Sequence, residues 1–436
     1  MPTQPSSADP TDNGARAAVQ HLWYEPLVGA ARGLERLTSA YHAELLVATL
    51  LGSVYTVAAQ PTAGDNRGTG VERFAAGFRE YLLAHPDQPR MVLLRAVLDS
   101  LVPPTRPGPQ PDAPAWVPRL GTATVTATSA YGDGYGDQIN YLLTCVYPDP
   151  ELGGPEHVVS ILVDRNLGTV KDLFVAAPAS VVHDRLREAV LPADGSYLVD
   201  VDPGVLRTAV TLAMAATDTA PQRDPDAAAD GDADGEAGDP PDGDDSFAAD
   251  RAVAVARLRL LPVPLAVERD HDGAGGDDEP VDIAGAFRDS PEAERLVGAP
   301  GDAASLVFCL DLIERFAAQR IDRNPLRWSP AAARMFLLDW LPRQAVLDAT
   351  DRALLPRVLD AWVRWAGRIS GLPPALVAAT VVDAARLRTA FVEQTRTGAR
   401  RSPQARAVAR MLADGVDPDD EAAVEVWLAG YNAANG

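Results

Sequence analysis

Four polar residues, Asp164, Asn166, Lys171 and Asp172, gather in the segment ILVDRNLGTVKDLFV and are the side chains best suited to hold a small ligand. If Asp164 pairs with Thr169 across a four-residue turn, Lys171 lies diagonal to Asp164 on one face of a hairpin, and Asp172 points to the other face. We interpret this pattern first as a surface ion pair across two strands. The alternative is a small polar ligand bound at the end of a sheet.

A second candidate is Asp339, which stands in the apolar stretch RWSPAAARMFLLDWLPRQ (residues 327–344). A carboxylate inside an apolar helix must find a cation or stay protonated, because an unpaired buried charge is costly. Pro342 is expected to break the helix that would align Arg343 with this carboxylate. The prediction is therefore a buried ion pair with another helix, for instance with Arg364, and this role is favoured over a catalytic one.

The third candidate is a basic patch between residues 386 and 410, where the only acid is Glu393. Its seven members are Arg386, Arg388, Arg396, Arg400, Arg401, Arg406 and Arg410. Such a patch could contact phosphate groups. Because the chain carries its own polyanion at 218–248, we hypothesise that this acidic segment docks on the patch and screens it.

Two motifs look like ligand loops but lack essential parts. The glycines of GDGYG (132–136) are followed by a strand pattern, whereas a phosphate-binding loop needs a helix after it, so a hairpin turn is expected. Asp230, Asp232 and Asp234 match the first positions of an EF-hand loop, but the twelfth position, which needs a bidentate Glu, is Pro241. No metal and no other cofactor is expected.

The cysteines and histidines exclude further chemistries. Cys145 and Cys309 are the only cysteines, and with six scattered histidines they give no zinc-ligand spacing. We expect two buried thiols in a reducing cytoplasm. The N-terminus has no apolar signal region, and the longest uncharged stretch, 45–64, is too polar to span a membrane, so the protein is expected to be cytoplasmic with no membrane partner.

The net charge of −22 is concentrated in two segments. Residues 218–250 hold twelve acids against Arg223, and residues 268–294 hold ten acids against Arg269 and Arg288, so the rest of the chain is nearly neutral. We therefore expect water around the negative charge and a packed interior with few titratable groups. Nothing in this distribution favours nucleic acid or an anionic membrane as a partner.

The elements that must position these residues are indicated by hydrophobic periodicity. Helices are predicted over 15–31, 34–59, 71–84 and 89–102, strands over 121–130, 139–147, 157–164 and 169–176, and helices again over 179–190, 203–217 and 247–261. In the second strand, Ile139, Tyr141, Leu143 and Cys145 share one face. The pattern predicts an antiparallel sheet of about four strands with helices on one face.

The C-terminal part is predicted to be helical, and its sequence indicates where several of the helices begin. Ser-Pro at 290, 329 and 402 and Asp-Pro at 202 and 417 provide an N-cap acceptor followed by proline at the first helical position. The helix from Ser329 is expected to end near Leu341. The next, 356–369, carries Val358, Trp362, Trp365 and Ile369 as a core-facing stripe.

The prediction is thus an α+β fold with an N-terminal helical segment, a small antiparallel β-meander with helices, and a mostly α-helical C-terminal domain. Its parts are a disordered tail (1–14), a helical segment (15–102), a Pro-rich linker (103–115), an α+β domain (116–217), an acidic disordered linker (218–248) and a helical domain (249–436) with an acidic break at 268–282.

Four stretches, AYGDGYGD, ILVDRNLGTVKDLFV, FLLDWLPRQ and ADGVDPDDEAAVEVWLAGYNA, resemble a family of uncharacterised proteins from high-GC Gram-positive bacteria. The resemblance spans most of 116–436, implies a cytoplasmic setting and supplies no catalytic residues; the acidic linker looks like an insertion relative to that family. Our first functional hypothesis is a non-catalytic protein that binds a protein partner through helical or sheet surfaces. The alternatives are an enzyme that uses carboxylates such as Asp164, Asp172 or Asp339, and a weak nucleic-acid binder through the basic patch.

Overall fold

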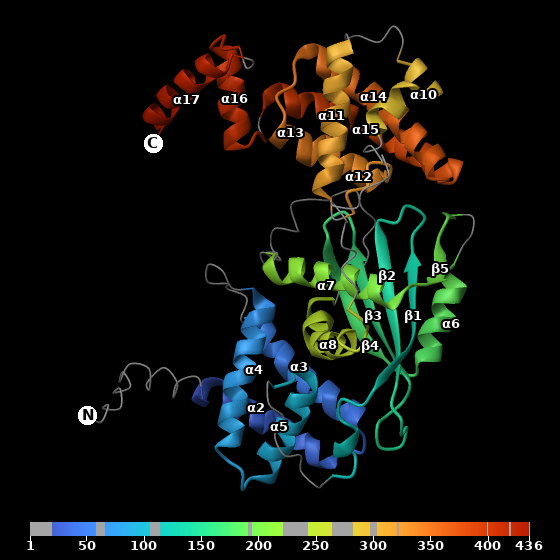
Figure 1. Ribbon diagram of the computed structural model, residues 1–436, viewed down its shortest axis with the longest axis vertical. Coiled ribbons are helices and arrows are strands. Elements are labelled where there is room, and N and C mark those ends of the chain that lie inside the picture. Colours follow the sequence, from blue (N-terminus) through green and yellow to red (C-terminus); the bar gives the residue numbers. More distant parts are fainter. Residues whose placement is uncertain are drawn as a thin grey trace, which may run out of the picture.

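A five-stranded antiparallel sheet forms the centre of the N-terminal part of the molecule (Figure 1). The computed structural model describes residues 20–57, 66–104, 114–190, 194–220, 243–263, 282–296, 303–320, 322–398, 400–417 and 420–435. The strands are β1 (Thr124–Gly132), β2 (Gln138–Val146), β3 (His157–Asp164), β4 (Thr169–Ala176) and β5 (Tyr197–Asp200), in the order β4-β3-β2-β1-β5. The predicted α+β class is confirmed. Strand β5, which pairs with the end of β1, was missed because four residues are too few to show an alternating pattern.

Helices pack on both faces of the sheet, whereas we expected them on one. The four predicted side chains of β2 do share a face and are buried in the main core: Ile139, Tyr141, Leu143 and Cys145. Helices α7 (Pro203–Thr219) and α8 (Gly243–Leu258) contribute to this same core. On the opposite face, Leu142 and Val158 pack against α6 (Ala179–Ala189). Apolar residues on both faces of a strand indicate that both faces are covered.

The N-terminal helices pack on one another and on α8, which lies against the sheet. They are α2 (Glu25–Ala30), α3 (Ala40–Val57), α4 (Arg67–Leu83) and α5 (Pro89–Leu101), with a π-helical turn at Gln20–Tyr24 and 3₁₀ turns at Ala31–Arg36 and Val117–Arg119. These helices, one face of the sheet, α7 and α8 share one continuous hydrophobic core. Helix α8, which the sequence assigned to the C-terminal domain, therefore belongs to the N-terminal body.

The acidic segment does not begin where we predicted. Asp218 lies in α7 and is buried, and its carboxylate accepts hydrogen bonds from Tyr55 Oη (3.0 Å) and Arg251 Nε (3.1 Å). Phe247 and Ala248, at the other end of the predicted linker, are buried in the core through α8. Residues 221–242, which include the EF-hand-like aspartates, lie outside the described residues, as do residues 105–113 of the Pro-rich linker, residues 268–281 of the acidic break and the N-terminal tail.

The C-terminal part is helical, as expected, and forms a second hydrophobic core. Its helices are α9 (Ile283–Arg288), α10 (Pro291–Glu294), α11 (Ala303–Gln319), α12 (Pro330–Arg334), α13 (Leu341–Gln344), α14 (Ala349–Ile369), α15 (Pro374–Thr397), α16 (Pro403–Ala413) and α17 (Glu421–Asn435). Ser290, Ser329, Ser402 and Asp202 cap their helices through side-chain oxygens, as predicted. The last helix begins at Glu421 and not directly after Asp417.

Two prolines lie inside helical segments, whereas we expected Pro342 to end one helix and Pro356 to begin the next. The segment from Ser329 continues through a π-helical stretch, Met335–Trp340, into α13, where Pro342 occupies the first turn. A π-helical turn shifts the hydrogen-bonding register, and prolines are tolerated in the first turn of a helix. Pro356 lies within α14. In that helix Val358, Trp362 and Trp365 are buried as predicted, but Ile369 is exposed.

A polar cluster buried in the N-terminal core contradicts our expectation of an interior with few titratable groups. Arg257 of α8 donates from Nη2 to Glu44 Oε2 of α3 (2.6 Å) and from Nε to His157 Nε2 of β3 (3.2 Å). Tyr147 Oη donates to the same Glu44 oxygen (2.9 Å), and the Gly121 amide donates to the other (2.9 Å). The cluster joins α3, the sheet and α8, with every carboxylate oxygen satisfied.

Candidate functional site

The predicted polar site at the β3–β4 turn is only partly assembled. Asp164 pairs with Thr169 across the turn as predicted, but its carboxylate accepts the amides of Asn166 (2.9 Å) and Leu167. A bulge in β4 leaves Lys171 opposite no residue of β3, and within the described residues Lys171 makes no ion pair with Asp164. Asp172 accepts the neighbouring amide of Leu173. Asn166 bonds to the C-terminal domain through Arg327.

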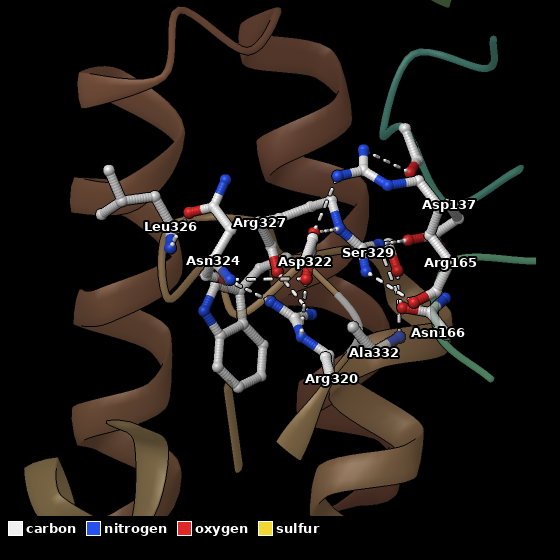
Figure 2. A network of polar contacts seen from close by, with 12 residues as sticks. Asp137, Arg165, Asn166, Arg320, Asp322, Asn324, Leu326, Arg327, Ser329 and Ala332 are labelled. Carbon is white, nitrogen blue, oxygen red and sulfur yellow. Dashed lines mark hydrogen bonds and ion pairs between the residues drawn. The ribbon is translucent and has the colours of Figure 1, made fainter. Parts of the chain in front are cut away.

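Asn166 belongs to a polar network that joins the end of the sheet to the C-terminal domain (Figure 2). Its centre is Arg327, whose Nη1 donates to Asn166 Oδ1 (3.0 Å) and to Asp137 Oδ1. From its other side, Arg327 Nε donates to Asp322 Oδ2 (2.6 Å). Arg165, in the β3–β4 turn, reaches the same Asp322 oxygen at 3.1 Å. An arginine of the C-terminal domain thus bonds to the sheet turns, and an arginine of a sheet turn bonds to the C-terminal domain.

The loop between α11 and α12 holds these groups in place. Arg320 donates to the carbonyls of Arg327 (2.8 Å) and Asn324, and Asn324 in turn accepts the Leu326 amide (2.9 Å). Arg323 has a positive φ of 47°, a conformation that is uncommon for a residue with a side chain. The loop is thus fixed by side-chain to backbone bonds, which presents Arg327 to the sheet.

On the sheet side, the turn at GDGYG positions Asp137. Asp133 accepts the amides of Tyr135 (2.8 Å) and Gln138 (2.7 Å), which confirms the predicted hairpin turn between β1 and β2. Gly134 packs so closely on Asp194 and Leu376 that a Cβ there would collide with both. The turn contacts the C-terminal domain, and Tyr135 Oη donates to the Leu376 carbonyl (3.1 Å).

Burial sets the protonation behaviour of the network. Arg327 and Asp322 have side chains that are 6% and 7% exposed. Burial raises the pKa of Asp137, and this is only partly offset by Ser329 and Arg327. Burial also opposes ionisation of Asp322, but the bond from Arg327 and the charges of three arginines outweigh it and lower the pKa of that carboxyl. Burial and the nearby charge of Arg327 lower the pKa of Arg320 to about 10.

These groups are bonded to one another, which indicates a structural clamp. An attacking group or a general base must be free to face a substrate. The carboxylates of Asp137 and Asp322 instead accept hydrogen bonds from arginines. Together, three arginines and two carboxylates hold the N-terminal body and the C-terminal domain together. Sequence reasoning missed this network because its partners are about 160–190 residues apart in the chain. The only local signal was an arginine beside the buried Trp328 in the RWSP motif.

The buried ion pair predicted between Asp339 and Arg364 does not form. Asp339 is 45% exposed and pairs with Arg400 (3.1 Å), while Arg364 holds Asp360, one turn earlier on α14, with two bonds of 3.1 Å. The π-helical turn that contains Asp339 changes the direction of its side chain relative to a regular helix. We correct the prediction accordingly: both are partly exposed surface pairs.

The seven arginines of the basic patch are mostly engaged locally. Four have carboxylate partners: Arg386 with Asp383, Arg396 with Glu393, Arg400 with Asp339, and Arg410 with Asp414. Arg401 and Arg406 donate to the backbone carbonyls of Thr395 and Arg401. Arg388 lines a separate polar hollow. Carboxylates therefore compensate the charge of four of the seven arginines.

An apolar groove lies between α16 and α17. Its volume is about 410 Å³. It is lined by Pro403, Gln404, Ala407, Val408, Met411, Val424, Trp427, Leu428, Tyr431 and Asn432. The two helices project from the C-terminal domain at one end of the molecule (Figure 1), and α17 packs chiefly on α16. An apolar groove with a tryptophan and a tyrosine is a common feature of protein-binding surfaces.

The candidate residues show no arrangement for catalysis or metal binding. Asp164 and Asp172 lie on the β3–β4 hairpin, whereas Asp339 lies in the C-terminal domain, and none of them lines either of the two hollows described. In the part of the chain that the structure describes, no three His, Cys, Asp or Glu side chains are grouped to hold a metal ion. Within that same part, none of the helices combines the length and the apolar character needed to cross a bilayer.

Comparison with known proteins gives no match: no protein family, no curated protein and no solved structure is similar to this chain. The resemblance stated from the sequence therefore stays a prediction, and function must be argued from the geometry alone.

Proposed function

We propose that the protein acts without catalysis, by binding another protein chain through the hairpin of α16 and α17, and that this chain is a second copy of itself. The observation that carries the proposal is the exposure of α17. Among residues 421–433 none is buried, and Val426 is 75% exposed. An apolar helix that is left uncovered in the monomer favours a partner that covers it.

The composition of α17 supports a helical partner. It holds two valines, a tryptophan, a leucine and a tyrosine but no basic residue. Trp427 and Tyr431 stack with ring centroids 4.8 Å apart and line the groove, where large aromatic side chains would anchor a partner helix. A groove of about 410 Å³ accommodates several apolar side chains from one helical face.

The charges of the hairpin favour a second copy as that partner. Helix α16 carries Arg406 and Arg410 and no acid, whereas α17 carries Glu421 and Glu425 and no base. Two hairpins related by a two-fold axis can place α16 of each copy against α17 of the other, so that opposite charges meet twice and both grooves close. The result would be a four-helix arrangement.

A charge-swap experiment on the full chain tests this pairing. One variant carries Arg406→Glu and Arg410→Glu, and the other carries Glu421→Arg and Glu425→Arg. Each alone would repel its own copy and should weaken the dimer at least about tenfold. An equimolar mixture should restore a dimer, because the acidic hairpin of one variant matches the basic hairpin of the other. Light scattering coupled to gel filtration measures the masses.

The chain with all four changes is the matched control, because it should again form a dimer with itself. Rescue by mixing also separates a lost interface from a lost fold. A wild-type chain that stays monomeric at about 100 µM would contradict the proposal. So would a dimer that both variants leave intact, since it would have to use another surface.

We also propose the cytoplasm as the setting. Cys145 and Cys309 are both free and buried, which supports a reducing compartment.

A further inference from the structure

A second hollow, lined by residues of α14 and α15 and by the end of α10, has the opposite character from the hairpin groove. It is polar and measures about 210 Å³. Its lining residues are Arg295, Leu296, Arg357, Asp360, Ala361 and Arg388. The three arginines come from three places in the sequence: the end of α10, the middle of α14 and the middle of α15. Three guanidinium groups that converge in this way must repel one another unless an anion lies between them.

The acids around this hollow are already engaged. Asp360 lines it, but both of its oxygens accept bonds from Arg364 (3.1 Å each). Glu292 is held by two bonds of 2.8 Å from Arg368, and Arg295 adds only a longer-range attraction to it. Among the described residues, no carboxylate makes an ion pair with Arg295, Arg357 or Arg388. This contrasts with Arg386, two residues before Arg388 on α15, which pairs with Asp383 at 2.8 Å.

We propose that this hollow is a binding site for a small phosphate monoester, whose phosphate group lies between Arg295, Arg357 and Arg388. Guanidinium groups match phosphate oxygens through paired hydrogen bonds, and a dianion offers enough acceptors for three of them. The volume is below the about 300–1,000 Å³ of pockets for drug-sized ligands, so the molecule attached to the phosphate must be small. The site is separate from the hairpin groove and does not depend on the function proposed for it.

The test is isothermal titration of the full-length chain, at constant ionic strength, with glycerol phosphate and inorganic phosphate as probes. We expect saturable binding at one site per chain, tighter for glycerol phosphate. Arg357→Gln and Arg388→Gln should each weaken it at least about tenfold, the effect of losing one hydrogen bond to a charged group. Arg386→Gln should bind like the wild type, because that arginine is already paired and lies outside the hollow.

Several results would overturn the assignment. These are the absence of saturable binding up to about 10 mM probe, an equal loss in the Arg386→Gln variant, and tighter binding of succinate than of either phosphate. Sulfate that binds as well as glycerol phosphate would also overturn it, because the site would then read only the charge and shape of an inorganic ion. Melting temperatures without ligand should be the same for all variants, which shows that the changes act on the site and not on the fold.

Discussion

At the scale of single residues, His157 is held neutral by its surroundings. Its Nε2 receives a hydrogen bond from Arg257, which can only donate, and its Nδ1 lies 3.1 Å from the Pro155 carbonyl, which can only accept. The ring must therefore carry its proton on Nδ1. Burial and the charge of Arg257 lower the pKa of His157 to about 4. A proton added to Nε2 would break the bond from Arg257 and place two cations side by side.

This histidine should make stability depend on pH. Because the pKa in the folded state lies below the ordinary value of about 6.5, the unfolded chain binds a proton between these values that the folded chain does not. The free energy of unfolding should therefore be highest above about pH 6.5 and fall as the pH drops toward 4, by up to about 1.4 kcal/mol per pH unit.

Replacement of the ring by an amide that cannot ionise isolates this effect. In His157→Gln the loss of stability between about pH 7 and about pH 5 should be smaller than in the wild type by about 2 kcal/mol. Urea unfolding at the two pH values measures it. An identical pH dependence in wild type and His157→Gln would show that the ring is not held neutral in this way.

At the scale of elements, β4 is an edge strand whose free amides are covered by helices. The Val170 amide donates to Thr217 Oγ1 of α7 (2.8 Å), and the Val175 amide donates to Asp250 Oδ2 of α8 (2.8 Å). Exposed edge strands invite pairing with other chains, and side chains from a covering helix remove that hazard. Helices α7 and α8 thus protect the edge of the sheet and also contribute to its core.

Thr217→Val keeps the shape of the side chain and removes the acceptor for the Val170 amide. An unsatisfied buried amide should cost about 1–3 kcal/mol of unfolding free energy. Hydrogen exchange at Val170 should accelerate, and amides in the middle of β2 should change less. Thr208→Val is the matched control: Thr208 and Thr217 both donate back to a carbonyl four residues earlier, but only Thr217 also accepts from a strand. Slow exchange at Val170 in the Thr217 variant would mean that another acceptor replaces the hydroxyl.

What the sequence could predict at this scale was local. Four strands and the Ser-Pro helix starts follow from alternation and from N-cap chemistry, which act over a few neighbouring residues. The partner of Asp339 and the position of α8 depend on contacts between segments far apart in the chain, and periodicity carries no information about them. The π-helical turn before Pro342 was also beyond prediction, because it follows from packing around Phe336 and Trp340. The candidate site was predicted only through Asn166, since its partner Arg327 lies 161 residues away.

At the scale of the whole molecule, two hydrophobic cores are joined by a polar seam. The N-terminal core ends at the sheet turns, and the C-terminal core begins at the loop that presents Arg327. Seams of buried charge contribute little net stability but specify one arrangement, because a displaced domain would leave ions unpaired. We therefore expect the clamp around Arg327 to fix how the two bodies sit, while α16 and α17 project from the C-terminal domain away from the sheet (Figure 1).

Removal of the central arginine should loosen this seam. In Arg327→Met, Asp137 loses its arginine while it remains largely buried, and Asp322 keeps only Arg165 and the more distant Arg320. A broken buried pair of this kind costs about 3–5 kcal/mol. Since the loss falls on the contact between the bodies and not on either core, each body should stay folded while their docking weakens. Small-angle scattering should show a larger radius of gyration, and calorimetry should resolve two melting transitions.

Arg315→Met, which removes an exposed pair with Asp311 on α11, should change neither measurement. If Arg327→Met scatters and melts like the wild type, the apolar contacts between the domains suffice, and the network does not act as a clamp.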